Sequence, residues 1–286
     1  MNEPQKNSKL KFDSLSNETE LIKYLDAKSR LNSTKNLYQY TTVTALVGML
    51  RSRTLHLSNA KYMNDQLEYD MGDKTIWKDL FFSCFMMEEE ESIGMWSMYA
   101  QPWRDGVKIT IPKDAFRELV SSSMELIEID QVTKRPTGRK IWNKDDYKLW
   151  ISAVAYSNHE SIESKDEEVL RFGNQENRIL HDMAHVPELT GYIKDEAWQY
   201  EKEVRIKAQF NNVMGYERAA IQLPEKIIDS LTITPSPLFE GNLIDRIEKE
   251  ISKLVHVDRS KFNGKLNIRK ACDSCSLQLK EKKSNK

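Results

Sequence analysis

A carboxylate and a guanidinium stand two positions apart in the segment Glu203-Val204-Arg205. From Val204 onward apolar residues occupy alternate positions, the period of a half-buried strand, so Glu203 and Arg205 share its other face. A strand that begins in this way can present an ionised carboxylate at the rim of a sheet. Taken alone, the residues favour a more ordinary interpretation, in which Glu203, Arg205 and Lys207 form a solvated strand face held by ion pairs.

Other side chains suited to ligand binding lie upstream, on short elements that alternate between strand and helix. Residues 37–42 are predicted to form a strand that leads into a helix, and residues 54–58 a second strand with His56 and Ser58 on one face. A loop over 59–65 and a helical turn over 95–100 follow. The candidate side chains on these elements are Tyr38, Gln39, Tyr40, Ser58, Tyr62, Asn64, Asp65, Trp96 and Tyr99.

Each of these residues, taken singly, also has a structural explanation. Asn64 and Asp65 can cap a following helix, and His56 is typical of a strand rim. Trp96 and Tyr99 stand at helical spacing, which is typical of a core.

Possible metal ligands occur in incomplete sets. His181 and His185 would share one helix face, as in many metal sites, but no third ligand is apparent. Cys272 and Cys275 form a lone CxxC on a lysine-rich tail and supply two ligands only. The acidic run 88–91 is interpreted as a solvated loop, because consecutive carboxylates converge poorly on one ion. We therefore predict no bound metal.

The composition is that of a polar chain without a marked preference for one class of partner. Its 286 residues carry a formal net charge of -1, so no global basic field indicates nucleic acid. No apolar run has the length of a membrane span, no secretory leader is apparent, and 3 cysteines are too few for a disulfide scaffold. We expect a cytoplasmic protein that does not associate with membranes.

Short strands and helices alternate irregularly along the chain. This order predicts an α+β fold with a mixed, mostly antiparallel sheet flanked by helices. The expected divisions are a flexible N-terminal segment with a short helix over 1–34, a single domain over 35–270 and a charged tail over 271–286.

The remaining elements follow from the same local patterns. Strands are expected at 80–85, 106–112, 124–129, 152–156, 203–210, 219–224, 231–235 and 266–269. Helices are expected at 113–120, 162–170, 174–186 and 243–255. A polar connection is expected to reach Trp150, and Cys84 is interpreted as an inert thiol in the core.

Several large enzyme classes are excluded by their missing motifs. The chain has no glycine-rich phosphate loop, no GxSxG elbow, no HExxH and no paired zinc spacing. With 10 glycines in 286 residues, a nucleotide cradled by backbone amides in the usual way is not expected. A nucleotide would have to be held by side chains and aromatic stacking.

Five motifs in a fixed order suggest a family. They are Leu37-Tyr38-Gln39-Tyr40, Met63-Asn64-Asp65, Ser83-Cys84-Phe85, Met95-Trp96-Ser97-Met98-Tyr99 and Tyr200-Glu201-Lys202-Glu203-Val204-Arg205. In this order they resemble a large bacterial family of unknown function, the one numbered 2971, over about residues 37–235. The chain differs in having Met63 where the family often has Phe, and Gln66 where it often has Pro.

A more distant resemblance connects the same motifs with a function. A Tyr-x-Tyr-Thr strand, a helix, a Leu-x-Ser strand and a late strand with a lone glutamate are together similar to the ADP-ribosyltransferase fold. The resemblance implies NAD as the substrate, with Glu203 as the catalytic carboxylate and Tyr40 and Arg205 beside it. The histidine or arginine usual on the first strand is absent, and Gln39 stands nearest.

The resemblance also implies binding roles for the other candidates. Gln39 or Tyr40 would hold the nicotinamide-side ribose, Ser58 would help to shape the pocket, and Tyr62 or Tyr99 would stack on nicotinamide. Tyr38, Asn64, Asp65 and Trp96 complete the expected binding set. A fixed carboxylate suits this chemistry, because cleavage of the nicotinamide–ribose bond builds positive charge on the sugar.

Three functions stay open at this point. The first is an NAD-consuming transferase or glycohydrolase, acting as a bacterial toxin or an anti-phage defence effector on a protein or nucleic-acid acceptor. The second is a module that binds a ligand or another chain without turnover. The third is a metal-dependent, nuclease-like hydrolase using Asp65, Glu201 and Glu203. In the first case we expect the candidate residues to line a single cleft, with Arg205 paired to a carboxylate inside it.

Overall fold

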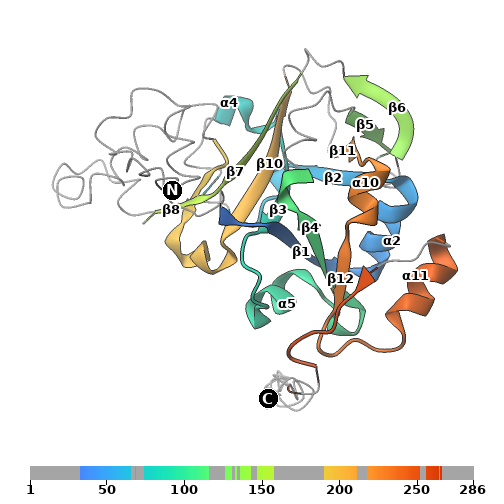
Figure 1. The fold of residues 1–286 in the computed structure, drawn as a ribbon. Coiled ribbons are helices and arrows are strands. Elements are labelled where there is room, and N and C mark those ends of the chain that lie inside the picture. Colours follow the sequence, from blue (N-terminus) through green and yellow to red (C-terminus); the bar gives the residue numbers. More distant parts are fainter. Residues whose placement is uncertain are drawn as a thin grey trace, which may run out of the picture.

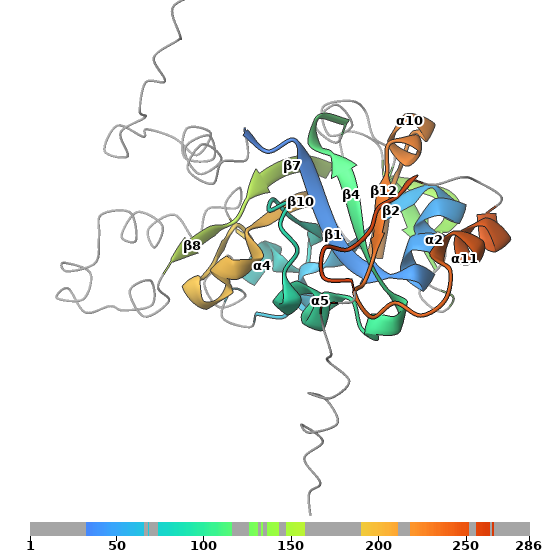
Figure 2. The same cartoon turned by 60° about the horizontal axis from the view of Figure 1, so that its bottom comes forward.

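The computed structural model describes most of the chain between residues 33 and 265. The described residues are 33–65, 68, 74–115, 126–130, 133, 136–142, 147–157, 190–210, 218–251, 256–263 and 265. Their centre is one 11-stranded sheet, with helices placed around it (Figures 1 and 2). The expectation of an α+β fold is confirmed.

The sheet is almost entirely antiparallel. Its order is β13-β12-β4-β1-β3-β2-β11-β5-β6, and β10 pairs with β3 and β7. The strands are β1 (Asn36–Thr42), β2 (Thr54–Asn59), β3 (Leu80–Met86), β4 (Gly106–Pro112), β5 (Leu126–Ile129), β6 (Pro136–Trp142), β7 (Tyr147–Ala153), β10 (Glu203–Phe210), β11 (Arg218–Gln222), β12 (Thr232–Pro235) and β13 (His256–Val257). Only the β12–β13 pairing within this sheet is parallel. A separate parallel pair is formed by β8 (Ala155–Ser157) and β9 (Ile193–Asp195).

Strand β3 is the branch point of the sheet. Along one edge it pairs with β10 over its whole length, from Leu80 to Met86. Along the other edge it pairs with β1 only at Met86 and with β2 only at Phe81 and Phe82. Strands β1 and β2 therefore diverge beside the middle of β3, and a space opens between them.

The helices are short and lie against this sheet (Figure 1). They are α2 (Val43–Ser52), α4 (Lys74–Trp77), α5 (Ile93–Tyr99), α10 (Glu225–Asp229) and α11 (Leu243–Ile251), with 3-10 turns η3 (Ala60–Tyr62), η4 (Trp103–Asp105) and η6 (Glu196–Glu201). The α2 helix is capped by Thr42, whose hydroxyl accepts a hydrogen bond from the Ala45 amide at 3.3 Å. In both ribbon views α11 lies beside α2.

Strand β10 is buried on both faces, which corrects the expectation of a solvated charged face. Val204 and Ile206 belong to the main core, as their alternation predicted. On the other face Glu203 is 5% exposed and Arg205 and Lys207 are 0% exposed. Such burial of ionised groups requires partners, and these partners define the site described below.

The local patterns predicted most of the elements but not all of them. The polar connection expected to reach Trp150 instead contains β6 and the first part of β7, and the strand expected at 152–156 is divided between β7 and β8. Strands β9 and β13 and the η6 turn were not expected. The helices proposed at 162–170 and 174–186, the strand at 266–269, both histidines at 181 and 185, and the Cys272–Cys275 pair lie outside the described residues.

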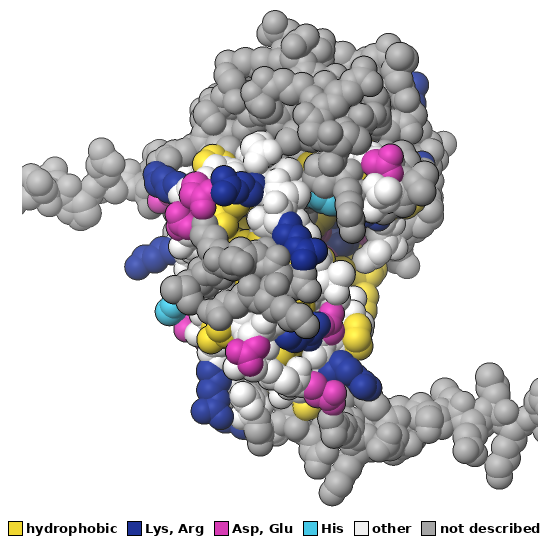
Figure 3. Space-filling model, turned by 90° about the vertical axis from the view of Figure 1, so that its right-hand side faces the viewer, with side chains coloured by type: hydrophobic (Ala, Val, Ile, Leu, Met, Phe, Trp, Pro, Cys, Tyr) yellow, Lys and Arg dark blue, Asp and Glu magenta, His cyan; other side chains and the backbone are white. Residues whose placement is uncertain are grey.

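No helix in the described ranges has the length and apolar character needed to cross a membrane. On the face shown in Figure 3, the visible basic and acidic side chains are interspersed, and neither sign dominates. This distribution agrees with the formal net charge of -1.

Candidate active site

A cavity of about 280 Å³ occupies the place where β1 and β2 diverge from β3. Its walls come from these three strands, the η3 turn with the loop after it, the α5 helix, the β9–η6 segment and the start of β10. The lining residues are Tyr38, Gln39, Tyr40, His56, Ser58, Tyr62, Met63, Asn64, Phe82, Ser83, Cys84, Phe85, Met86, Met95, Tyr99, Lys194, Glu201 and Glu203. The branch in the sheet therefore creates the site.

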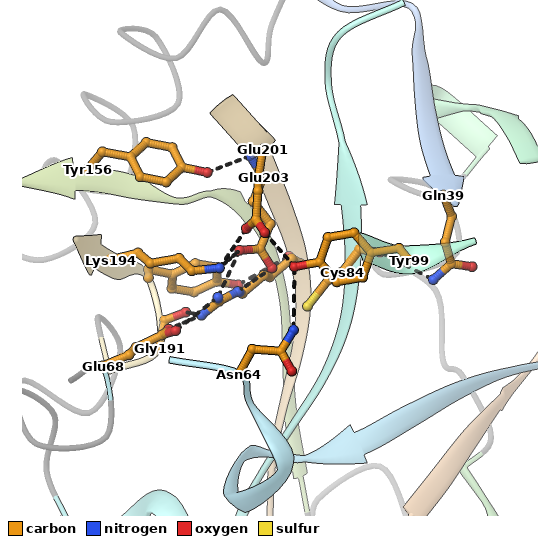
Figure 4. A network of polar contacts seen from close by, with 12 residues as sticks. Gln39, Asn64, Glu68, Cys84, Tyr99, Tyr156, Gly191, Lys194, Glu201 and Glu203 are labelled. Atoms are coloured by element: carbon orange, nitrogen blue, oxygen red, sulfur yellow. Dashed lines mark hydrogen bonds and ion pairs between the residues drawn. The ribbon is translucent and has the colours of Figure 1, made fainter. Parts of the chain in front are cut away.

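Gln39 bridges the gap between β1 and β3 with its side chain. Its Nε2 donates a hydrogen bond to the Cys84 carbonyl at 3.2 Å, beside the part of β3 that β1 and β2 leave uncovered (Figure 4). The side chain thus takes a backbone acceptor that a strand would otherwise satisfy. Gln39 is a structural clamp as well as a wall of the cavity.

The Glu203 carboxylate is held by a buried guanidinium. Arg205 donates from Nε to Glu203 Oε1 and from Nη2 to Oε2, both at 2.8 Å. The same guanidinium makes a second bidentate contact with Glu68 and donates to the Gly191 carbonyl at 2.5 Å. Two carboxylates therefore share one arginine, and only Glu203 reaches the cavity.

Lys194 joins Glu203 to a second carboxylate. Its ammonium lies 2.6 Å from Glu201 Oε2 and 3.4 Å from Glu203 Oε2. Glu201 Oε1 accepts a short hydrogen bond from the Tyr99 hydroxyl, which in turn lies 3.5 Å from Asn64 Nδ2. Figure 4 shows these groups converging from β9, η6, α5 and the loop after η3.

The surroundings fix the ionisation of Glu203. Burial acts to raise its pKa, but the charge and hydrogen bonds of Arg205, together with Lys194, lower it to about 2. Burial raises the pKa of Glu68. Burial and the neighbouring Glu201 carboxylate both raise the pKa of the Tyr99 hydroxyl. Glu203 is thus an ionised carboxylate at neutral pH, facing a cavity with a protonated phenol beside it.

Two other tyrosines and a histidine form the opposite wall. Burial raises the pKa of Tyr40 to about 12, and its oxygen accepts a hydrogen bond from the Ser92 amide at 3.2 Å. Lys108 lies over the Tyr38 ring at 5.1 Å. Burial and the nearby charge of Arg218 lower the pKa of His56, so this imidazole is neutral at neutral pH. The wall formed by β1 and β2 therefore carries no charge.

Most of the predicted site residues come together in this cavity. Those in its lining are Tyr38, Gln39, Tyr40, Ser58, Tyr62, Asn64, Tyr99 and Glu203. Three others lie outside the lining. Arg205 is enclosed behind Glu203, and its expected pairing with a carboxylate is present. Asp65 is buried, and Trp96 is a core residue that packs edge-on against Tyr40 at 4.7 Å and donates from Nε1 to Glu91.

No local pattern predicted Lys194, Glu68 and Tyr156 as residues of the site. Lys194 lies in the three-residue strand β9, and the Tyr156 hydroxyl accepts a hydrogen bond from the Glu203 amide at 2.8 Å. Glu68 meets Arg205 across 137 positions of chain. The spacing of two between Glu201 and Glu203 marks Glu201 as a candidate, but only in the hypothesis of a metal-dependent hydrolase. Cys84 was expected in the core and instead lines the cavity as a half-buried free thiol.

Comparison with known proteins begins with the family. Residues 95–206 match the model of a protein family of unknown function, DUF2971. The expected resemblance is confirmed over this span, which contains two of the five motifs and is shorter than the expected 37–235. This region begins within α5 and ends within β10, so it contains Tyr99, Lys194, Glu201, Glu203 and Arg205.

Solved structures give a distant likeness. The chain is similar to DarT from Thermus sp. 2.9 in complex with carba-NAD+, at 11% identity and a TM-score of 0.33, covering 80% of this chain and 96% of that one. The DarT complex with ADP-ribosylated ssDNA is similar at 12% identity and a TM-score of 0.32, covering 80% and 95%. Among curated proteins no match was found.

Proposed function

We propose that the protein is an ADP-ribosyltransferase-like enzyme that consumes NAD, as a transferase or a glycohydrolase. The observation that carries the proposal is the Glu203 carboxylate, ionised and fixed at a cavity in the branch of the sheet. A preorganised negative charge stabilises positive charge that develops on a substrate, and it needs no reorganisation during the reaction.

The proposed reaction breaks the bond between the nicotinamide nitrogen and ribose C1′. The electron pair of this bond goes to nicotinamide, which leaves as a neutral ring. An acceptor oxygen or nitrogen forms the new bond to C1′ and releases its proton to solvent; when water is the acceptor, the product is ADP-ribose. Glu203 supports the positive charge on the ribose as the bond breaks, and Arg205 holds the carboxylate in place.

The lining suggests how NAD would be held. Tyr62 and Tyr99 would pack against the nicotinamide ring, and Ser58, Tyr38 and Gln39 would meet the ribose. Asn64 positions the Tyr99 hydroxyl. A volume of about 280 Å³ is near the lower end of ligand sites, which begin at roughly 300 Å³, so the cavity suits the nicotinamide half of the molecule.

The setting of the reaction belongs to the same proposal. The acceptor would be water, a protein or a nucleic acid, and the enzyme would act in the cytoplasm as a bacterial toxin or an anti-phage defence effector. DarT is described in complexes with NAD+ and with ADP-ribosylated ssDNA.

One observation favours a binding module as the second candidate. Both oxygens of Glu203 already accept hydrogen bonds from Arg205, and Lys194 adds a further contact. A carboxylate with this many cationic partners stabilises a developing positive charge less than a lone carboxylate does. In this second case the cavity would bind the nucleotide without cleaving it.

A metal-dependent hydrolase fits the geometry less well. The Lys194 ammonium lies between Glu201 and Glu203, in the space a shared divalent ion would need. Asp65, the third residue of that hypothesis, does not line the cavity.

Nicotinamide release from NAD by the purified protein tests the proposal. We expect release that the Glu203→Gln variant loses by at least about a hundredfold, since a single transition-state contact of this kind is worth that much. The Glu225→Gln variant makes the same chemical change in an exposed ion pair with Arg53 and is expected to keep full activity.

Folding must be controlled, because Glu203 is part of a buried network. Tyr62→Ala removes an exposed ring and leaves that network intact, and it is expected to raise KM for NAD. NAD binding without release by the wild-type protein would contradict the enzyme and support the binding module. If the wild-type protein shows no nicotinamide release and no NAD-dependent shift in Tm, both the enzyme and the binding module are contradicted.

A further inference from the structure

The charged groups in the cavity lining are unequal in sign. Among the described residues of the lining, Glu201 and Glu203 are the acids and Lys194 is the one formal cation. His56 does not add a charge, because burial lowers its pKa. An anionic ligand such as a pyrophosphate would meet two carboxylates there and a lysine that already contacts both of them.

The network behind the lining does not reverse this imbalance. It adds Arg205 and Glu68, which are paired with each other in a bidentate contact. Within the lining itself two acids, Glu201 and Glu203, therefore face one cation, Lys194, and the acids are in excess there. The side chain of Glu68 is 1% exposed, so the excess is presented to the cavity through Glu201 and Glu203.

The remaining lining is rich in aromatic rings. Four tyrosines and two phenylalanines line the cavity: Tyr38, Tyr40, Tyr62, Tyr99, Phe82 and Phe85. The rings of Tyr38 and Phe82 already carry internal cations, Lys108 at 5.1 Å and Arg205 at 5.2 Å. Tyr62 is 49% exposed but carries Lys61 over its ring at 4.9 Å, so the half-buried Tyr99 is the ring that remains for a ligand.

The first strand adds no positive charge. Gln39 is neutral, and its amide nitrogen is used in the bond to the Cys84 carbonyl. Aromatic faces beside paired carboxylates attract a flat organic cation through its charge and through the ring quadrupole. They offer nothing to a phosphate.

We infer that the cavity recognises the positively charged pyridinium ring of an N-glycosylated nicotinamide and does not read the phosphates of the dinucleotide. The inference rests on the proposed function and narrows its substrate class to N-ribosylated pyridinium cations. Nicotinamide riboside, which has the cationic ring and ribose but no phosphate, is then a ligand of the same cavity. Neutral nicotinamide, the product of cleavage, binds weakly and leaves.

Two small probes that differ mainly in charge test this inference. 1-Methylnicotinamide carries the ring cation, whereas nicotinamide is neutral and of nearly the same shape. We expect the wild-type protein to bind the cation at least about tenfold more tightly in calorimetric titrations, with the preference falling as salt is added. Glu201→Gln removes the excess charge and should reduce the preference severalfold, while Glu88→Gln, the same change outside the lining, should leave it intact.

The outcomes separate this inference from the proposed reaction. Equal or tighter binding of nicotinamide, or no binding of either probe, overturns the inference even if NAD is cleaved. Cation preference in a protein that releases no nicotinamide from NAD supports the inference and contradicts the reaction. If Glu201→Gln does not fold, a preference that is insensitive to salt in the wild-type protein is the overturning result.

Discussion

At the scale of the residue, the central feature is a carboxylate that is buried and ionised at the same time. Glu203 is 5% exposed, and an isolated ion at such a position would be strongly destabilising. Arg205 compensates through two hydrogen bonds of 2.8 Å. The arginine is needed to keep the charge of Glu203 at the cavity, so stability and chemistry depend on one contact.

This contact makes a prediction for the acid side of the stability curve. The pKa of Glu203 falls from 4.5 to about 2 on folding, so its contribution is present above pH 4.5 and is lost as pH falls toward 2. At about 1.4 kcal/mol for each pH unit, the contribution is about 3 kcal/mol. We expect the difference in unfolding free energy between wild type and Glu203→Gln to shrink by about 2 kcal/mol between about pH 6 and about pH 3 in urea titrations, because the rest of the contribution is lost only below pH 3.

Glu225→Gln is the matched control, because Glu225 pairs with Arg53 on the surface and both side chains are about half exposed. An exposed pair is worth little, so this variant should track the wild type at every pH. A Glu203→Gln difference that stays constant with pH would show that the carboxylate is not held ionised by Arg205.

At the scale of the element, the turn before β9 closes the site from behind. Gly191 has φ +80, and its carbonyl accepts the hydrogen bond from Arg205. A Cβ at this position would lie 2.3 Å from Cζ of Phe82, a residue of the cavity lining. The turn therefore needs glycine for its conformation and for the close approach to β3.

The Gly191→Ala variant should be destabilised by more than the strain of a left-handed residue. Gly241 has φ +89 and nothing within 4 Å of its Cβ position, so Gly241→Ala measures the strain alone. That strain is about 1 kcal/mol, and we expect Gly191→Ala to cost at least about 1 kcal/mol more in chemical denaturation, from overpacking against Phe82. Equal losses in the two variants would mean that Phe82 moves aside without cost.

The elements also show what local sequence could and could not predict. The strand at Gly106–Pro112 was predicted correctly, because alternation is a local property of the chain. The second partner of Arg205 was not predicted, because Glu68 lies 137 positions away and no local pattern marks it. The same limit explains the solvated face wrongly expected for β10, since burial of its charged face depends on segments distant in sequence.

At the scale of the whole molecule, the end of the described chain is tied to the helix that lines the cavity. Glu91 was expected in a solvated acidic loop. Its carboxylate instead accepts hydrogen bonds from Trp96 Nε1 at 3.1 Å, from the Ser260 hydroxyl at 2.7 Å and from the Lys261 amide at 2.8 Å. One side chain thus joins the segment after β13 to α5.

Loss of this carboxylate should release the C-terminal segment without unfolding the sheet. In Glu91→Ala we expect faster hydrogen exchange at the Lys261 amide, because its acceptor is gone, while amides in β3 and β10 keep their protection. Glu89→Ala is the matched control, since Glu89 accepts a hydrogen bond from Lys108 through its backbone carbonyl, which the substitution keeps. If both variants exchange alike at residues 256–263, β13 alone fixes the segment. If Glu91→Ala also weakens protection in α5, then the C-terminal segment and the cavity wall are coupled through Trp96.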